Sequence, residues 1–290
     1  MSKKWAYLII LSIIWGSSFI LIKKGLIGLT DYQVGALRIV LTSFFLFSVG
    51  FKSLKEIKKK HWAWVVISGF VSSFFPPFLF AMAQNHIDSA IASILNSLTP
   101  LATVAVGILL FKIFSTKRQL AGVVIGLAGT VFLILVGAEL NPNQNYGYSF
   151  LIIIASLGYA LNVNIIKKHL QDISALAVTT GNFVFIVVPA LIILYMSGFF
   201  ETIFHSKEMQ ISFGYVAILS LFGTAIAKVI FNRLVQISSP VFASSVTYTM
   251  PIVALGWGMV DGESFTLLQG VAAAIILIGV YMANKRYKTD

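Results

Sequence analysis

The residue of this sequence best placed for binding chemistry is Lys228, which stands in the apolar stretch GTAIAKVIFNRLVQ. It follows Tyr215 by 13 residues, which places it about 20 Å along a helix that rises 1.5 Å per residue. A lysine at that depth can extend its stem so that the ammonium reaches the polar surface. Alternatively, the cation faces an internal cavity and binds a carboxylate or phosphate. The sequence leaves both interpretations open.

Two apolar stretches, SAIASILNSLTP at 89–100 and PVFASSVTYTMP at 240–251, carry several hydroxyl groups and end on a proline. Small hydroxyl residues allow close helix packing and can bond the carbonyls that a proline frees. The alternative is a polar face on a water-filled cavity. Asn96 and Thr247 favour the cavity, since they are larger polar groups at matched positions. We expect Pro100 and Pro251 to bend their helices.

Further polar and aromatic side chains within apolar stretches are candidates for the same cavity. Arg38, near the start of its stretch, could anchor at lipid headgroups, pair with Asp31 or gate an opening. Asn162 and Asn164 are two residues apart and therefore point to different faces of a helix. Ordinary helix contacts remain an equal alternative for the aromatic and serine candidates. The candidate substrate-contact residues are Lys228, Asn96, Thr247, Trp15, Ser18, Arg38, Tyr159, Asn162 and Tyr248.

The acidic and histidine residues are all expected at the ends of apolar stretches or in loops. Carriers driven by protons usually hold such a group within the membrane, so facilitated export or exchange is the expected mode. With zero cysteines and no clustered ligands, the sequence predicts no metal site and no cofactor. The acidic and histidine residues of the sequence are Asp31, Glu56, Asp88, Glu139, Asp172, Glu201, Glu208, Asp261, Glu263, Asp290, His61, His86, His169 and His205.

The elements that must position these residues are membrane helices. The chain is 58% hydrophobic and 11% charged, whereas soluble domains carry about 25% charged residues. Apolar runs of roughly 20 residues, enough to cross a bilayer as a helix, fill most of its length, and the loops leave no room for a soluble domain. We predict an all-α integral membrane protein with ten transmembrane helices at 5–23, 33–51, 62–83, 88–111, 119–137, 148–167, 175–198, 212–235, 240–260 and 266–284.

The net charge of +11 is explained by topology and not by a nucleic-acid partner. Ten spans place both termini on one side, and Lys and Arg concentrate in cytoplasmic loops. With the termini in the cytoplasm, 16 of the 21 Lys and Arg residues are cytoplasmic and three are outside. The expected partners are therefore the lipid bilayer and a small-molecule substrate, in the cell (inner) membrane, and the oligomeric state is open. The cytoplasmic set is Lys3, Lys4, Lys52, Lys55, Lys58, Lys59, Lys60, Lys112, Lys117, Arg118, Lys167, Lys168, Arg233, Lys285, Arg286 and Lys288.

The two hydroxyl-rich stretches belong to an internal repeat of the whole chain. When Pro100 is set against Pro251, Asn96 meets Thr247 and Ser93 meets Ser244. The order of matches continues through both halves, which we place at 1–140 and 145–290. Each half holds five helices, and because five is odd the second half enters the membrane inverted. Such inverted repeats are typical of secondary transporters that expose a central site to each side in turn.

The same alignment shows where the halves differ. Lys228 takes the place of Pro77, and Arg38 takes roughly the place of Asn182. Two consecutive prolines, Pro76 and Pro77, lack backbone donors in mid-helix. We expect them to break or strongly kink the third span at the edge of the site.

An ordered set of motifs resembles the EamA-type drug/metabolite transporters over nearly the whole chain. The resemblance implies a ten-helix, inverted-repeat carrier of small metabolites, often amino acids, usually directed outward. The family often places a Gly-Glu pair after the fourth and ninth helices. This sequence keeps Gly262-Glu263 but reads Phe111-Lys112 in the first half. The motifs are WGSSF at 15–19, ALRIVL at 36–41, LNSLTPLATVAVGILL at 95–110, YTMPIVALGWGMVDGE at 248–263 and QGVAAAIILIGVYM at 269–282.

Three other function classes are alternatives to a metabolite exporter. A membrane-embedded enzyme needs clustered acid, base or metal ligands, and no such motif occurs. A receptor or scaffold has no need of inverted repeats with polar residues in mid-membrane. An organic-anion or nucleotide-sugar exchanger remains the alternative, because Lys228 favours an anionic group, although phosphate sites usually gather several cations.

Overall fold

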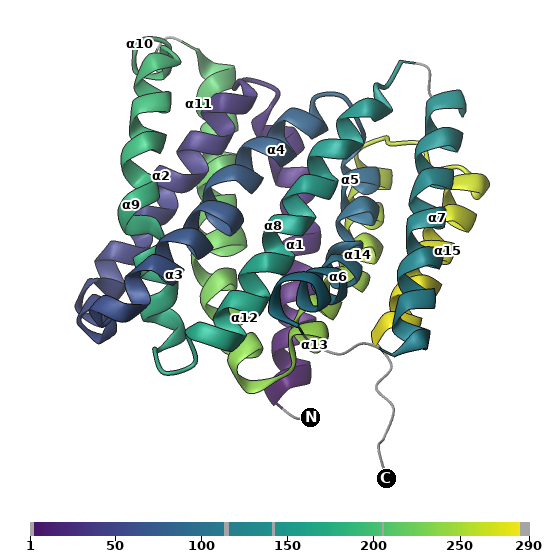
Figure 1. Ribbon diagram of the computed structural model, residues 1–290. Coiled ribbons are helices and arrows are strands. Elements are labelled where there is room, and N and C mark those ends of the chain that lie inside the picture. Colours follow the sequence, from purple (N-terminus) through teal and green to yellow (C-terminus); the bar gives the residue numbers. More distant parts are fainter. Residues whose placement is uncertain (1–2, 113–115, 141–142, 205, 285–290) are drawn as a thin grey trace.

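The computed structural model describes residues 3–112, 116–140, 143–204 and 206–284, and this part of the chain contains helices and no strand (Figure 1). Five residues used in the sequence interpretation, His205, Lys285, Arg286, Lys288 and Asp290, lie outside the described residues. The helices are α1 (Lys3–Gly25), α2 (Asp31–Gly50), η1 (Phe51–Glu56), α3 (Lys59–Gly69), η2 (Phe70–Phe74), α4 (Phe75–Gln84), α5 (Ser89–Asn96), α6 (Thr99–Phe111), α7 (Lys117–Leu140), η3 (Tyr146–Tyr148), α8 (Ser149–His169), α9 (Ala175–Met196), α10 (Phe199–Thr202), α11 (Lys207–Ile218), η4 (Leu219–Ile226), α12 (Ala227–Ile237), α13 (Pro240–Ser244), η5 (Ser245–Tyr248), α14 (Met250–Val260) and α15 (Leu267–Asn284).

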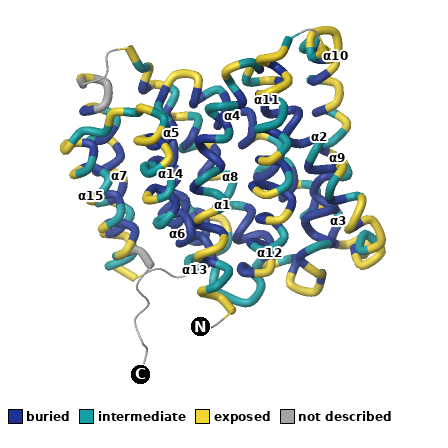
Figure 2. Tube along the Cα trace, turned by 180° about the vertical axis from the view of Figure 1, so that it is seen from behind, coloured by how far each residue is buried: buried dark blue, intermediate teal, exposed yellow. Residues whose placement is uncertain are grey.

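These elements join into ten apolar spans, as the sequence predicts. Within the described residues, nine are long and apolar enough to cross a membrane, and the tenth is a shorter apolar helix, Leu267–Met282. Large apolar side chains cover the outer surface, as lipid-facing helices require: Val124 is 67% exposed, Leu135 63% and Tyr195 76%. The exposed residues ring the buried interior in Figure 2. The chain is therefore a multi-pass membrane protein.

The bundle has two faces, one at each end of its helices. Helix α1 begins and α15 ends at the same edge of the bundle, the lower edge in Figure 1. We call this edge the terminal face and the other edge the opposite face. Helix α1 runs through the middle, whereas α7 and α15 pack side by side at one end of the molecule. Gly279 permits that approach, because a Cβ there would meet the backbone of Gly122 and Gly126 on α7.

The third and eighth spans each contain a widened, π-helical turn at matched places. Turn η2 joins α3 to α4, and turn η4 joins α11 to α12. The expected break at Pro76 and Pro77 does not occur, because the span stays helical through both prolines. The two prolines stand in the first turn of α4, where a missing N–H is tolerated, and the π turn η2 directly precedes that helix. Such turns free backbone carbonyls and often mark functional sites.

The fourth and ninth spans are interrupted in mid-membrane, also at matched places. The fourth span stops at Asn96 and restarts at Thr99 as α6. The ninth passes from α13 through the tight turn η5 before α14 begins at Met250. Pro100 and Pro251 each stand in the first turn of the new helix, where the absent N–H is tolerated. Each proline at which a bend was expected therefore directly follows an interruption of its helix.

Candidate functional site

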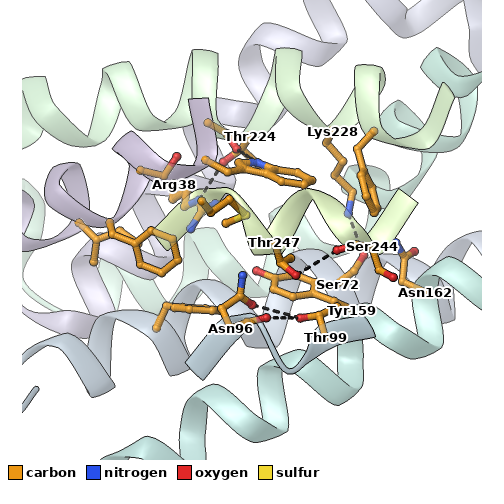
Figure 3. Close-up of a pocket in the computed structure, with 18 residues that line it drawn as sticks. Arg38, Ser72, Asn96, Thr99, Tyr159, Asn162, Thr224, Lys228, Ser244 and Thr247 are labelled. Carbon is orange, nitrogen blue, oxygen red and sulfur yellow. Dashed lines mark hydrogen bonds between the residues drawn. The ribbon is translucent and has the colours of Figure 1, made fainter. Parts of the chain in front are cut away.

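A cavity of about 100 Å³ lies where the two halves meet, and spans from both halves line it. A volume of this size accommodates several water molecules and therefore a small solute. Its lining comes from α1, α2, α4, α8 and α12, from the two π turns and from the two interrupted spans (Figure 3). Eight of the nine residues singled out in the sequence line it: Trp15, Ser18, Arg38, Asn96, Tyr159, Asn162, Lys228 and Thr247.

The ninth residue, Tyr248, is not part of this lining. Its hydroxyl donates a hydrogen bond to the Val280 carbonyl oxygen at 3.3 Å. The ring therefore faces α15, because the tight turn η5 changes the direction of each side chain relative to a regular α-helix. The geometry gives no support to Tyr248 as a substrate contact.

Lys228 is buried, with 8% of its surface exposed, and its ammonium stays inside the protein. The Nζ atom donates to the Ser72 hydroxyl oxygen at 2.7 Å, across from α12 to the π turn η2 of the first half. The alternative of a lysine that extends to the membrane surface is therefore wrong for this structure. The lysine points into the cavity.

Arg38 also faces the cavity, and neither of its simple structural explanations holds. It is 9% exposed, so its guanidinium is not at the lipid headgroups, and no ion pair joins it to Asp31 in the described part of the chain. Instead its Nε atom donates to the Thr224 Oγ1 atom at 2.8 Å, on the π turn η4 of the second half. Arg38 follows Asp31 by seven positions, which places it about 10 Å along the helix from its start.

The two cations are held in a crossed arrangement. Arg38 of the first half bonds the π turn of the second, and Lys228 of the second half bonds the π turn of the first. Each hydroxyl also donates to a backbone carbonyl near its own turn: Ser72 to Ser68 at 2.6 Å and Thr224 to Leu219 at 3.4 Å. With their protons committed, both hydroxyl oxygens are free to accept from a cation. The pattern orients each cation without neutralising it.

The interrupted spans supply a polar surface facing these cations. Thr99 Oγ1 donates to the Asn96 carbonyl at 2.8 Å, and Thr247 Oγ1 donates to the Ser244 carbonyl at 3.0 Å. Ser97 Oγ donates to the Thr247 carbonyl at 2.8 Å and so joins the two breaks. The hydroxyls therefore satisfy carbonyls freed at the breaks, as the packing interpretation requires, and also line the cavity. Asn96 turns its amide toward the open space in Figure 3.

Aromatic rings form the apolar walls. Trp15 Nε1 donates to the Gly223 carbonyl at 2.9 Å, a group in the π turn η4, and its ring packs 5.0 Å from that of Phe231. The Phe80 and Tyr159 rings lie 6.1 Å apart, nearly parallel. The matched positions Trp15 and Tyr159 thus line the cavity from both halves, which suits a solute with an apolar part.

Asn162 and Asn164 face different neighbours, as their spacing predicts. Asn162 Oδ1 accepts a hydrogen bond of 2.5 Å from Ser68 Oγ and lines the cavity. Asn164 Nδ2 donates to the Thr103 carbonyl at 3.2 Å and packs against α6. Sequence reasoning did not single out Ser72, Thr99 or Thr224 for the cavity. A usable signal existed for Ser72, because it lies just before Pro76 and Pro77 in VSSFFPP.

An ionic cluster at the opposite face joins three spans that line the cavity. Glu263 Oε1 accepts from Lys23 Nζ at 2.8 Å and from Ser89 Oγ at 2.7 Å, and Oε2 accepts from the Ala90 backbone N–H at 3.1 Å. Asp261 pairs with Lys23 at 2.8 Å and with Lys24. We call this set, Lys23, Lys24, Ser89, Asp261 and Glu263, the ionic clasp. It connects the end of α1, the start of α5 and the chain after α14.

Both clasp carboxyls are held ionised. Burial acts to raise the pKa of Glu263, but hydrogen bonds from Lys23, Ser89 and Ala90 outweigh it and keep the pKa below its ordinary value. Burial also raises the pKa of Asp261, and the two lysines more than offset it. Glu263 is 4% exposed in its side chain and lies at the N-terminus of α5, where backbone N–H groups favour an anion. The sequence indicated Glu263 through the family resemblance alone.

The described residues hold no group of three or more His, Asp or Glu side chains that could bind a metal ion. What the cavity offers instead is two cations, hydroxyl and amide groups, and aromatic surface. Such a set binds and orients a solute by charge, hydrogen bonds and apolar contact.

Comparisons with known proteins agree with this architecture. The model of the EamA-like transporter family matches residues 3–135 and 147–285. A protein of Salmonella typhimurium described as "Probable amino-acid metabolite efflux pump" is 24% identical over 97% of this chain and 95% of its own length. The "Uncharacterized inner membrane transporter YedA" of Escherichia coli is 28% identical over 69% of this chain and 63% of its own length. A solved structure described as "Crystal structure of protein" superposes with a TM-score of 0.64 at 16% identity, covering 98% of this chain and 96% of that one.

Proposed function

This chain belongs to the EamA-like transporter family, and from that premise we propose that it is a secondary carrier that exports small organic metabolites, such as amino acids. The solute binds in the central cavity, which opens to the two sides of the membrane in turn. The proposal includes no chemical conversion of the solute. The substrate contacts we propose are Lys228, Arg38, Asn96, Thr247, Trp15, Ser18, Tyr159 and Asn162.

The observation that carries the proposal is the position of the cavity between two interrupted spans and two π turns, one of each from each half. Interrupted helices at the interface of inverted repeats are the usual place for a carrier's substrate, since unwound backbone offers polar groups there. Rocking of one half against the other would open the cavity first to one face and then to the other. The name of the Salmonella relative supports amino-acid metabolites as the solute class.

We propose further that the protein resides in the inner membrane with both termini in the cytoplasm. The concentration of Lys and Arg in loops of the terminal face supports this orientation. The Escherichia coli relative is named an inner membrane transporter. With this orientation, the terminal face is cytoplasmic and the opposite face, with the ionic clasp, is external.

We also propose that export runs down the solute's gradient or by exchange. None of the cavity-lining side chains in the described part of the chain is Asp, Glu or His. A proton relay usually needs such a group within the membrane. Lys23, Asp261 and Glu263 lie at the opposite face and, in this proposal, act in closing that face.

The test is transport by purified protein in liposomes, with labelled amino acids, organic acids and nucleotide sugars as the panel. We expect uptake of at least one small organic solute. The rate of uptake should be higher when the same solute is also present inside the liposomes than when it is present only outside. An imposed pH difference should not change the rate. Liposomes without protein serve as the control. No uptake of any member contradicts the carrier, and uptake that depends steeply on the pH difference contradicts the absence of proton coupling.

A further inference from the structure

We propose that the cavity selects a small organic anion, which binds between Arg38 and Lys228. Such a solute has more carboxylate groups than ammonium groups and therefore a net negative charge. This deepens the proposed function and rests on it, because it names the class of solute that the carrier's cavity takes.

The charged groups that line the cavity are basic. Arg38 and Lys228 both line it, and no Asp or Glu is among its lining residues in the described ranges. The acidic groups of the ionic clasp pair with Lys23 and Lys24 and not with the two cavity cations. The site therefore holds two basic groups that no lining carboxylate balances.

Each of the two basic side chains has a neutral hydrogen-bond partner. The hydrogen-bond partners are hydroxyl groups, Ser72 for Lys228 and Thr224 for Arg38, and a neutral hydroxyl orients a cation without cancelling its charge. Moving a charge out of water without a counter-ion carries a large free-energy penalty. An anion entering the cavity would relieve that penalty, whereas a second cation would increase it. This is differential binding that depends on the solute's charge.

The arrangement of the two basic side chains suits a carboxylate. In Figure 3 both cationic side chains reach into one space, and Asn96, Thr247 and Tyr159 lie across from them. Arg38 uses its Nε atom for Thr224, which leaves the terminal nitrogens of the guanidinium directed to this space. Those two nitrogens form a planar fork that matches a carboxylate, and the Lys228 ammonium adds a point charge.

The volume and the aromatic walls of the cavity limit the carbon skeleton of the solute. The cavity volume of about 100 Å³ and the Trp15, Phe80 and Tyr159 rings suit a compact carbon skeleton. A zwitterionic amino acid would place its ammonium in a site that already holds two cations and offers it only neutral acceptors. An anionic amino acid or a dicarboxylate presents a negative charge to both cations. A phosphate monoester shares this chemistry and is distinguished from a carboxylate in the experiment.

The experiment compares solutes of similar shape and different charge. Purified protein is placed in liposomes, and uptake of labelled 2-oxoglutarate, glutamate, glutamine and glycerol 3-phosphate is measured at constant ionic strength. In parallel, each solute's effect on Tm is measured in detergent, since a ligand that binds the folded state raises Tm. We expect 2-oxoglutarate and glutamate to be taken up and to raise Tm, and glutamine to do neither. A response to glycerol 3-phosphate in place of the carboxylates would overturn the carboxylate assignment.

Two charge-removing variants have matched controls elsewhere in the chain. We expect Lys228→Met and Arg38→Gln each to reduce the preference for glutamate over glutamine by roughly 30-fold or more, as for loss of a buried charge partner. Lys207→Met removes a lysine charge at the exposed start of the same span, and Arg233→Gln removes an exposed arginine charge. Both controls should keep the wild-type preference within about twofold.

A further pair of variants keeps the proposal testable if the charge-removing proteins do not fold. Ser72→Ala and Thr224→Val retain both cations and remove only their hydroxyl partners, so anion preference should persist with weaker affinity. Uptake of glutamine with no uptake of the two acids overturns the anion assignment and leaves the carrier standing. The anion assignment is also overturned if no acid is taken up and none shifts Tm. In that case, the uptake panel of amino acids, organic acids and nucleotide sugars tests the carrier function separately.

Discussion

The two faces of the bundle carry equivalent helix ends but hold them by different chemistry. At the opposite face, the end of α1 and the start of α5 meet the chain after α14 in the ionic clasp. At the terminal face, the repeat places the end of α8 beside the start of α13 and the end of α6. There Lys167 Nζ donates to the Ser238 carbonyl at 2.8 Å, and Lys168 lies 5.3 Å from the Phe111 ring centroid.

An inverted repeat therefore fixes where the helix ends meet, but not how strongly they are held together. Every salt bridge within the described residues belongs to the clasp. Hydrogen bonds to charged groups, about 1.5–3 kcal/mol each, hold both faces. The clasp has several on Glu263 and adds the ion pairs of Asp261. The terminal face has the bonds of Lys167 and one exposed cation–π contact of about 0.5–1 kcal/mol. The opposite face is therefore the more firmly closed of the two. The departure from the Gly-Glu motif at Phe111-Lys112 is the sequence origin of the difference.

The largest effect is expected from breaking the clasp. Glu263→Gln keeps the side chain's shape but leaves Lys23 with one partner fewer beside a buried site, so we expect about 3 kcal/mol of lost stability. The measurement is Tm in detergent. Glu208→Gln, an exposed carboxyl at the start of α11, is the control and should shift Tm little. Equal shifts from the two substitutions would show that the clasp is not a specific contact.

A smaller effect is expected at the terminal face. Lys168→Met removes the cation over Phe111 and keeps an apolar side chain, so we expect a loss of about 0.5–1 kcal/mol. The same Tm measurement applies. A loss as large as that from Glu263→Gln would remove the contrast between the two faces.

The smallest effect is the pH dependence of the clasp near neutrality. The pKa values of Glu263 and Asp261 are lowered in the folded protein, so their stabilisation is present above the ordinary values of 4.5 and 3.8. It is lost as pH falls through the lower folded values. The Tm difference between wild type and Glu263→Gln should therefore stay constant from about pH 8 to pH 6 and shrink below about pH 4.5. A difference that changes between pH 6 and 8 would point to another titrating group.

The sequence alone predicts most of the fold and much of the cavity. Ten apolar stretches and the match of Pro100 to Pro251 locate the spans and their breaks, because hydrophobic length and proline chemistry act locally. Eight of the nine residues chosen for the cavity line it, since polar groups within a membrane span must face protein or water.

What the sequence could not predict depends on contacts between distant segments. Snorkelling and cavity-facing lysines have the same local sequence, so only the contact of Lys228 with Ser72, 156 positions away, distinguishes them. The sequence could not indicate the partner of Arg38 for the same reason, because Thr224 is 186 positions from it. Tyr248 was misplaced by the tight turn η5, and the partners of Glu263 lie in the other half of the chain.

The most direct test of the account asks whether one cavity is reached from the two faces in turn. Asn96→Cys introduces a single thiol at the cavity of this cysteine-free chain, and an impermeant thiol reagent is applied to either side of oriented liposomes. We predict labelling chiefly from the terminal face in the otherwise wild-type protein, and a shift toward the opposite face when Glu263→Gln opens the clasp. Labelling at equal rates from both sides in both proteins, or no effect of Glu263→Gln on the preferred side, would contradict the account.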